Sequence, residues 1–194
     1  MDDRIRRWDE RYARLEGLSS VAPSPPLPEA LPGLAPGLAL DLACGAGRNS
    51  IFLAERGWRV QALDGSRQGL ERMMEEARRR AVDGAIEPRL VDLEEPGLAL
   101  PEAGWDLICD FYFLHRPLFE QIRRAVRPGG TFAAAIQVRS QPAERGRFLL
   151  EPGELSALVL SWGWEILLDR EVAALSDQRH ATAELIARCP RDDG

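Results

Sequence analysis

From Leu38 onward, short apolar runs alternate with segments of helical periodicity, and this alternation constrains the fold more than any other feature. Short apolar runs are typical of buried strands, whereas apolar residues spaced three and four apart are typical of one helix face. The strand-like segments are residues 38–44, 58–63, 86–91, 105–113 and 131–138. Strands that alternate with helices predict a doubly wound, Rossmann-like α/β fold, with a mostly parallel sheet covered on both faces.

The end of the chain breaks the alternation. Two strand-like segments, residues 164–171 and 181–189, follow each other with no helical pattern between them. Strands joined without a crossover helix pair antiparallel, so these two should form a hairpin. We therefore predict a seven-stranded sheet in which the last strand is antiparallel. With 194 residues, the chain has the length of one domain.

Two different segments precede the sheet. Ile5, Trp8 and Tyr12 repeat at helical spacing and predict an amphipathic helix. Six prolines between Pro23 and Pro36 should then prevent a regular helix or a central strand, and they predict an extended strap or an ordered connector. The expected organisation is a helix over residues 1–16, which could act as a lid, a strap over 19–37 and a Rossmann-like core over 38–190.

Composition excludes several kinds of chemistry. All 25 basic residues are arginines, so no lysine can form a Schiff base or a P-loop contact. The net charge of −6 argues against stable binding of nucleic acid. The charged start and the lack of an 18-residue apolar run predict a cytoplasmic protein without a membrane segment. Three widely separated cysteines should be reduced and should hold no metal.

The densest chemical signal lies where the first strand turns into its helix, at Asp41 and the following Gly45-Ala46-Gly47. Glycines let a ligand approach the backbone closely, and a helix start offers free N–H groups. A carboxylate at Asp41 would repel a pyrophosphate, but it could accept hydrogen bonds from an ammonium group, directly or through water. The third glycine of the dinucleotide fingerprint is also missing, since Ser50 stands in its place. A purely structural strand-to-helix turn remains an alternative.

Two further acidic residues follow the second and third strands. Asp64 comes 19 residues after Gly45 and precedes Gly65 and Ser66, where doubly wound folds place an acid that binds a ribose diol. The alternative is that Asp64 caps the following helix. Asp92 could accept the amino group of adenine while Leu93 covers the ring; a solvated loop aspartate is the alternative. Loop and acids together favour a nucleoside ligand.

These residues resemble a known family. Leu40-Asp41-Leu42-Ala43-Cys44-Gly45-Ala46-Gly47 resembles the first motif of class I S-adenosylmethionine-dependent methyltransferases. The continuation Arg48-Asn49-Ser50, the early Trp8-Asp9-Glu10-Arg11-Tyr12 and the late Phe148-Leu149-Leu150-Glu151-Pro152-Gly153-Glu154-Leu155 are similar to the tellurite-resistance, thiopurine-type branch. The resemblance runs from Trp8 to near Glu171. Arg127-Pro128-Gly129-Gly130 matches the turn before the fifth strand of the family.

The resemblance implies a cofactor, S-adenosyl-L-methionine, and its product S-adenosyl-L-homocysteine. It places Asp41, Gly45 and Gly47 at the methionine moiety, Asp64 at the ribose, and Asp92 at the adenine. It places Asp110 and Phe111 near the sulfonium. The full candidate set for cofactor binding is Trp8, Tyr12, Asp41, Gly45, Gly47, Arg48, Asn49, Asp64, Gly65, Ser66, Asp92, Leu93, Asp110 and Phe111.

The acceptor side gives weaker signals. His115 and Arg116, which follow the fourth strand, are the candidate catalytic residues. His115 could position an acceptor or remove its proton; a residue making a local hydrogen bond at a helix start is the alternative. We expect a small-molecule acceptor and a monomer or homodimer. The competing functions are a non-catalytic sensor or scaffold that binds the same cofactor and, less favoured, a nicotinamide-dependent oxidoreductase.

Overall fold

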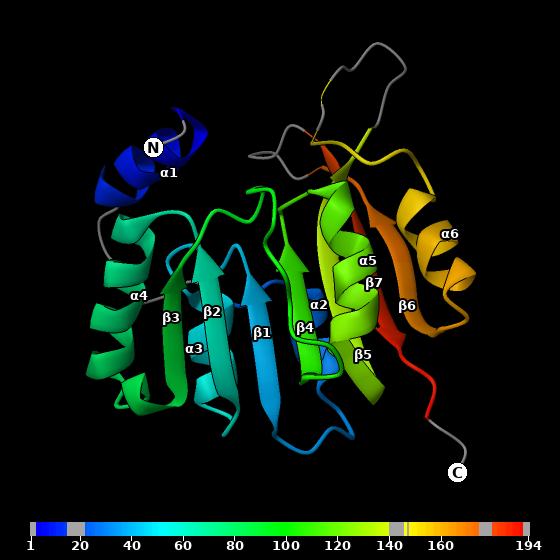
Figure 1. The fold of residues 1–194 in the computed structure, drawn as a ribbon, viewed down its shortest axis with the longest axis horizontal. Helices are drawn as coiled ribbons and strands as arrows, with labels where there is room; N and C mark the ends of the chain where they lie inside the picture. The colour runs from blue at the N-terminus through cyan, green and yellow to red at the C-terminus, as the bar shows by residue number, and fades with distance from the viewer. Residues whose placement is uncertain (1–2, 15–21, 140–145, 147, 175–179, 192–194) are drawn as a thin grey trace.

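The computed structural model describes residues 3–14, 22–139, 146, 148–174 and 180–191. They form one seven-stranded sheet in the order β3-β2-β1-β4-β5-β7-β6 (Figure 1). The first five strands are parallel, and β7 is antiparallel to both of its neighbours, so the predicted fold and terminal hairpin are confirmed. The strands are β1 (Leu38–Leu42), β2 (Arg59–Asp64), β3 (Ile86–Leu90), β4 (Trp105–Phe111), β5 (Val126–Val138), β6 (Glu165–Val172) and β7 (Ala181–Arg188).

Helices cover both faces of the sheet because its strands are apolar on both sides. Buried side chains of α2, α3 and α4 pack with Ala39, Val60 and Leu107 on one face. Those of α5 and α6 pack with Leu40 and Ile108 on the other face, which faces the viewer in Figure 1. The helices are α1 (Asp3–Arg14), α2 (Pro26–Ala30), α3 (Arg48–Ala54), α4 (Arg67–Arg79), α5 (Arg116–Ala125) and α6 (Glu154–Ser161).

The proline-rich strap contains a short regular helix, which corrects the expectation that its prolines prevent one. This helix is α2, with buried Leu27 and Ala30 in the core beside α3. Proline is tolerated in the first helical turn because the N–H it lacks would have no partner there, and Pro26 is the first residue of α2. The strap is held to α3 by Asn49, which accepts from the Ser24 backbone N–H at 2.8 Å and donates to the Ser24 hydroxyl at 3.2 Å.

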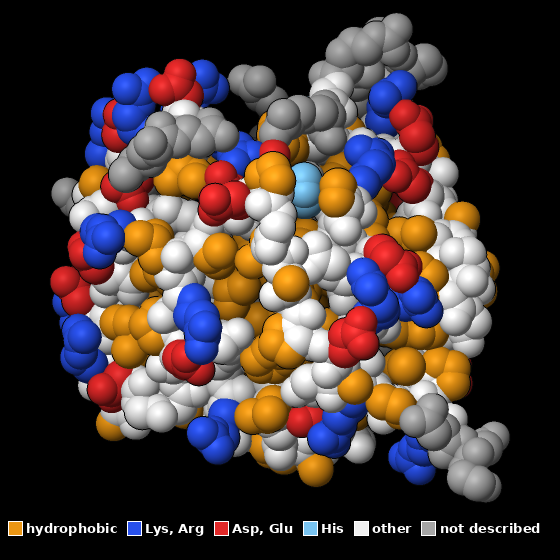
Figure 2. Space-filling view, in the orientation of Figure 1, with side chains coloured by type: hydrophobic (Ala, Val, Ile, Leu, Met, Phe, Trp, Pro, Cys, Tyr) orange, Lys and Arg blue, Asp and Glu red, His pale blue; other side chains and the backbone are white. Residues whose placement is uncertain are grey.

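The crossover from β3 to β4 carries no helix, unlike the other parallel connections. Residues 91–104 return across the face covered by α5. Leu93 is buried there, and Leu98 and Leu100 pack against the same core. Apolar side chains are visible across the middle of this face, between scattered charged ones (Figure 2).

Strand ends differ by one to a few residues from the prediction. The strand over residues 105–113 ends at Phe111, because Tyr112 takes a left-handed backbone with φ of 63°. The Arg-Pro-Gly-Gly sequence is not a turn before β5 but lies within it. There the register with β4 shifts between Trp105 and Leu107, and Gly129 takes a positive φ of 77°. The sequence pattern of a turn therefore marks a bulge in a continuous strand.

The two edge strands differ in character from the interior ones. In β3, every residue after Ile86 is exposed, including Pro88 and the ion pair of Glu87 with Arg89 at 2.7 Å. In β6, exposed and half-buried residues alternate, and the pairing with β7 shifts between Ile166 and Leu168. Both edges of the sheet are therefore solvated along much of their length.

Candidate functional site

The sheet has a topological switch point between β1 and β4. From β1 the chain proceeds to β2 on one side, and from β4 it proceeds to β5 on the other. In open α/β sheets, ligands bind in the crevice at the carboxyl ends of the two strands where the order reverses. The loop after β1 holds Gly45 and Gly47, and β4 ends with Asp110 and Phe111. The structure thus brings these predicted site residues to one end of the sheet.

Close packing explains both glycines of the loop. Gly47 has φ of 83°, and an added Cβ would collide with the side chain of Met73 on α4. Gly45 has φ of 56°, and its Cβ would collide with the hydroxyl of Tyr12. Gly69, which was not predicted, lets α4 approach this loop: its Cβ would lie 3.0 Å from the Gly45 carbonyl oxygen. The geometry demands glycine whether or not a ligand is bound.

Asp41 is a carboxyl buried on the α3 side of the sheet. Only 1% of its surface is exposed. The Ser50 hydroxyl donates a 2.5 Å hydrogen bond to Asp41 Oδ2. Burial raises the pKa of Asp41 to about 7, against the opposing effect of the Ser50 hydrogen bond. A carboxyl held at this pKa favours a cationic partner, because a positive charge would stabilise its ionised form.

Asp64 ends β2 and connects the glycine loop to the next turn. Its Oδ2 accepts from the Gly45 N–H and its Oδ1 from the Ser66 N–H, both at 2.7 Å. Burial raises the pKa of Asp64, the two backbone hydrogen bonds oppose that rise, and the Asp9 carboxylate adds to it. The capping role considered for Asp64 belongs to Ser66, whose hydroxyl accepts from the Gly69 N–H at 3.0 Å. Each Asp64 oxygen keeps a further lone pair for a hydroxyl ligand.

Helix α1 docks on this turn through Asp9, which was not among the predicted site residues. The Asp9 Oδ1 atom accepts from the Ser66 hydroxyl at 2.7 Å and from the Gln68 N–H at 2.9 Å. A carboxylate is favoured there because the first N–H groups of α4 carry partial positive charge. Asp9 lies within the Trp8-Asp9-Glu10-Arg11-Tyr12 motif, so the sequence did contain a signal for it.

The two ends of α1 contact two more of the predicted loops. At one end, Arg4 pairs with Asp92 at 3.0 Å and with Glu94. At the other, Tyr12 covers Gly45 and stacks with Trp8 at 5.8 Å between ring centroids. Trp8 remains 44% exposed. The helix therefore lies across the loops after β1, β2 and β3, and the partly exposed Asp92 carboxylate is paired with it.

Arg48 is a half-buried cation at the first turn of α3. Among the described residues it forms no ion pair, and its guanidinium lies 5.1 Å from the centroid of the Tyr112 ring. Tyr112 combines a left-handed backbone with a hydrogen bond from its N–H to the Ala135 carbonyl at 2.7 Å. Such backbone outliers in non-glycine residues cluster at functional sites. Tyr112 is a second residue that sequence reasoning left outside the cofactor set.

Asp110 is fully buried on the face opposite to Asp41. Ile108 packs on the α5 side, and alternation along β4 places Asp110 on that side as well. Its Oδ1 has no hydrogen-bond partner within the described part of the chain. Burial first, and the Asp41 charge second, raise the pKa of Asp110 well above its usual value. The neighbouring Phe111 is buried on the α3 side, so the two residues predicted near the sulfonium point to different faces.

Other predicted residues have partners of their own. Asn49 holds the strap at Ser24. Arg116 makes a bidentate ion pair with Glu154 on α6, with N···O distances of 2.6 and 2.8 Å. It also donates a hydrogen bond to the Leu149 carbonyl. His115 is the N-cap residue of α5, but its side chain does not cap the helix. The catalytic roles of His115 and Arg116 stay predictions.

All three cysteines are thiols rather than disulfides in the structure. Cys44 and Cys109 are buried free thiols, and burial raises the pKa of both. No cluster of His, Cys, Asp and Glu within the described ranges has the arrangement of a metal site. None of the helices in the described segments is long and apolar enough to span a membrane.

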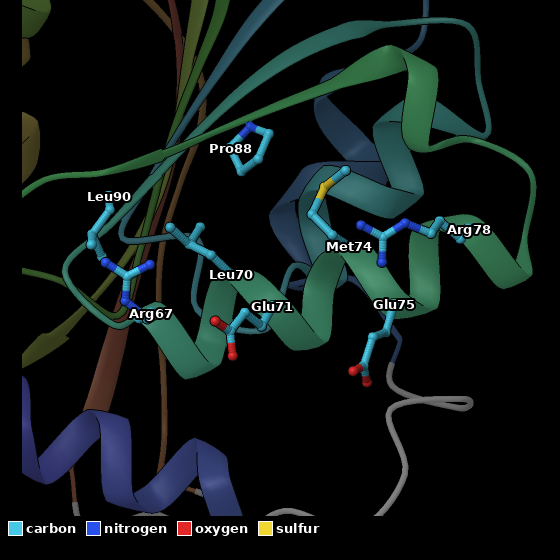
Figure 3. Close-up of a pocket in the computed structure, with 8 residues that line it drawn as sticks. All are labelled: Arg67, Leu70, Glu71, Met74, Glu75, Arg78, Pro88 and Leu90. Atoms are coloured by element: carbon cyan, nitrogen blue, oxygen red, sulfur yellow. The ribbon is translucent and has the colours of Figure 1, made fainter.

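Two surface hollows lie away from the switch point. The larger, of about 360 Å³, runs between α4 and the edge strand β3, with an apolar floor and a charged rim (Figure 3). It is lined by Arg67, Leu70, Glu71, Met74, Glu75, Arg78, Pro88 and Leu90. The smaller, of about 230 Å³, lies beside α6 and β6. Neither contains a predicted site residue.

Comparison with known proteins agrees with this fold. Residues 39–130 match the family model of a methyltransferase domain. This stretch runs from β1, through the glycine loop, Asp64 and Asp92, to the bulge in β5. No curated protein sequence matches the chain.

Several solved structures share the fold. TehB from Haemophilus influenzae superposes with a TM-score of 0.72 at 19% identity, over 94% of this chain and 67% of that one. An N1-methyltransferase of 1,6-didemethyltoxoflavin from Burkholderia thailandensis, solved with S-adenosylhomocysteine, gives 0.67 at 20% identity, over 86% and 77%. The [4+2]-cyclase SpnF gives 0.70 at 17% identity, over 85% and 78%. The chain therefore has the fold of class I methyltransferases.

Proposed function

We propose that this chain is an S-adenosylmethionine-dependent methyltransferase acting on a small molecule. The observation that carries the proposal is the pair of opposite charges at the glycine loop: the buried Asp41 carboxyl and the Arg48 guanidinium, which forms no ion pair among the described residues. An amino acid carries an ammonium and a carboxylate on adjacent atoms, and the methionine part of the cofactor has both. The match of residues 39–130 to a methyltransferase domain supports the same conclusion.

The residues present fit the cofactor group by group. Arg48 would receive the methionine carboxylate, and Asp41 would receive the ammonium, directly or through water. Asp64 would accept from the ribose hydroxyls with its remaining lone pairs. Asp92 and Leu93, at the start of the helix-free crossover, would serve the adenine amino group and ring. A nicotinamide dinucleotide fits less well, because its pyrophosphate would meet Asp41 at the glycine loop.

We propose that helix α1 is the lid of this site. It rests on the loops after three strands, through Tyr12 at Gly45, Asp9 at Ser66 and Arg4 at Asp92. None of its described side chains is buried, so its docking depends on partly exposed polar and apolar contacts that can open and close. Closure of a lid excludes water and completes a catalytic site.

When bound, the cofactor supplies a methyl group already activated by its sulfonium. The protein has to hold the acceptor in line with that methyl and exclude water. Proximity and orientation can lower a barrier by about 7 to 11 kcal/mol. Tyr112, held in its strained backbone at the end of β4, and the lid residue Trp8 would wall the acceptor side.

A base is needed only if the acceptor arrives protonated. His115, at the start of α5, is our candidate to position the acceptor or to take its proton. Arg116 forms an ion pair with Glu154, and we propose that this pair orients the N-terminus of α5 beside the site. The acceptor is a small molecule, and the chain acts in the cytoplasm as a monomer or homodimer without nucleic acid or membrane.

The tellurite-resistance, thiopurine-type branch is the finer assignment that we favour. The Arg48-Asn49-Ser50 continuation and the early tryptophan motif support it, and TehB is among the similar structures. Members of one fold share cofactor loops and differ in acceptor loops, so the branch name does not identify the acceptor.

The second candidate function is cofactor binding without methyl transfer. The observation that favours it is the likeness to SpnF, a [4+2]-cyclase, at a TM-score of 0.70. A cofactor site of this kind would contain the same loop and acids, with a different pocket beside it.

The deciding experiment is calorimetric titration with S-adenosylmethionine, followed by a screen of small thiols, amines and phenols for S-adenosylhomocysteine production. Binding and turnover support the methyltransferase. Binding without turnover across the screen favours the second candidate, and no binding by the folded protein refutes both.

A further inference from the structure

The strongest feature outside the assigned site residues is the contact between α1 and the turn after β2. Asp9 comes from a helix that precedes the whole sheet, yet its Oδ1 accepts two hydrogen bonds from the first turn of α4, from the Ser66 hydroxyl and the Gln68 N–H. Ile5 and Tyr12 also approach this turn, at Gly65 and Gly69, but through apolar atoms, whereas Asp9 hydrogen-bonds to it through its side chain. We propose that Asp9 is a positioning residue that sets the Asp64 carboxylate for the cofactor ribose.

Ser66 connects the two carboxylates, because its hydroxyl and its backbone N–H each bond to one of them. The Ser66 hydroxyl donates to Asp9 at 2.7 Å and accepts from the Gly69 N–H at 3.0 Å, so both of its roles are used. The Ser66 N–H donates to Asp64 Oδ1 at 2.7 Å. The other oxygen, Oδ2, accepts from Gly45 at the same distance. By holding the Ser66 hydroxyl and the Gln68 N–H, Asp9 restrains the backbone of the turn and with it the Ser66 N–H, which is one of the two anchors of Asp64.

The chemistry of the turn explains why an acidic lid residue suits this position. Without Asp9, the Ser66 hydroxyl proton and the Gln68 N–H would lose their acceptor, and Ser66 would be free to rotate away from its capping position. Hydrogen bonds to a charged acceptor are stronger than those to a neutral one. When α1 closes over the site, Tyr12 therefore covers the glycine loop. At the same time, Asp9 orders the turn that positions the Asp64 carboxylate.

This inference rests on the proposed function, since it takes Asp64 as the ribose acceptor. It predicts a ligand-specific effect. In Asp9→Ala, affinity for S-adenosylhomocysteine should fall about tenfold, the order of one hydrogen bond to a charged group. Affinity for the 2′,3′-dideoxyribose analogue, which offers Asp64 no hydroxyl, should change less than about twofold. Asp9→Asn keeps an oxygen acceptor and should restore most of the loss.

The test is calorimetric titration of both ligands into wild type, Asp9→Ala, Asp9→Asn and the control Glu10→Ala, whose side chain is exposed on the same helix. No described side chain of α1 is buried, so Asp9→Ala should fold, and a thermal melt checks this. A selective loss for the ribose ligand, rescued by asparagine, supports the inference. Equal losses for both ligands would mean that Asp9 only holds the helix, and this result overturns it.

The wild-type titrations separate this inference from the proposed function. If wild type does not bind S-adenosylhomocysteine, the proposed function fails and the inference falls with it. If wild type binds and prefers the ribose ligand, but Asp9→Ala keeps the full preference, only the role of Asp9 is refuted.

Discussion

The buried Asp41 carboxyl should make the stability of the cofactor-free protein depend on pH. Its pKa rises from an ordinary 3.8 to about 7 in the folded chain. Between these values the folded state keeps a proton that the unfolded state releases, so the free energy of unfolding falls as pH rises from about 4 to 7. A rise of roughly three pKa units lowers the free energy of unfolding by about 4 kcal/mol over the whole pH window. Of this loss, about 2 to 3 kcal/mol occurs between pH 5 and pH 8.

Asp41→Asn isolates this effect. The amide is neutral at every pH, and its oxygen can still accept the Ser50 hydroxyl, so the packing is preserved. Urea unfolding at pH 5 and pH 8 should show that the variant gains about 2 to 3 kcal/mol relative to wild type at the higher pH. Glu102→Gln, which removes an exposed carboxylate, is the matched control. Equal pH dependence in wild type and Asp41→Asn would refute the reasoning.

Three further substitutions test the site. Asp64→Ala should weaken S-adenosylhomocysteine binding by about 1.5 to 3 kcal/mol in calorimetry, and unchanged affinity in a folded variant would remove Asp64 from the ribose site. Gly47→Ala should cost about 1 to 3 kcal/mol in denaturant unfolding, because its φ of 83° and the Met73 side chain oppose a Cβ, whereas Gly84→Ala, in open space, should not. Trp8→Ala should lose cofactor affinity with a nearly unchanged melting temperature; the reverse would make α1 structural rather than a lid.

Local patterns in the sequence predicted the sheet and the glycine loop well. The order of apolar runs and helical faces determines a doubly wound sheet, and the switch point follows from that order. Gly45 and Gly47 were assigned to ligand approach. The structure shows that Tyr12 and Met73 already require them to be glycine, so part of their signal comes from packing.

The contacts between distant segments could not be predicted in this way. Arg4 and Asp92 are 88 residues apart, and Asp9 and Ser66 are 57 apart. Such pairs depend on how α1 packs against the folded sheet, and the local periodicity of the sequence does not determine that packing. The bond between Arg116 and Glu154, over 38 residues, is of the same kind and shows why a charge next to a site is not by itself a catalytic group.

The edge strand β3 limits how copies of this chain can associate. An open edge with regular N–H and C=O groups is a template onto which another strand can add. Here Pro88 removes a donor in the middle of the edge, and the exposed Glu87 and Arg89 would have to lose hydration if a strand approached. Growth of the sheet from one molecule into the next is therefore disfavoured at this side. Concentrated protein should resist fibrillar aggregation through β3, and replacing Pro88 with valine would remove part of that resistance.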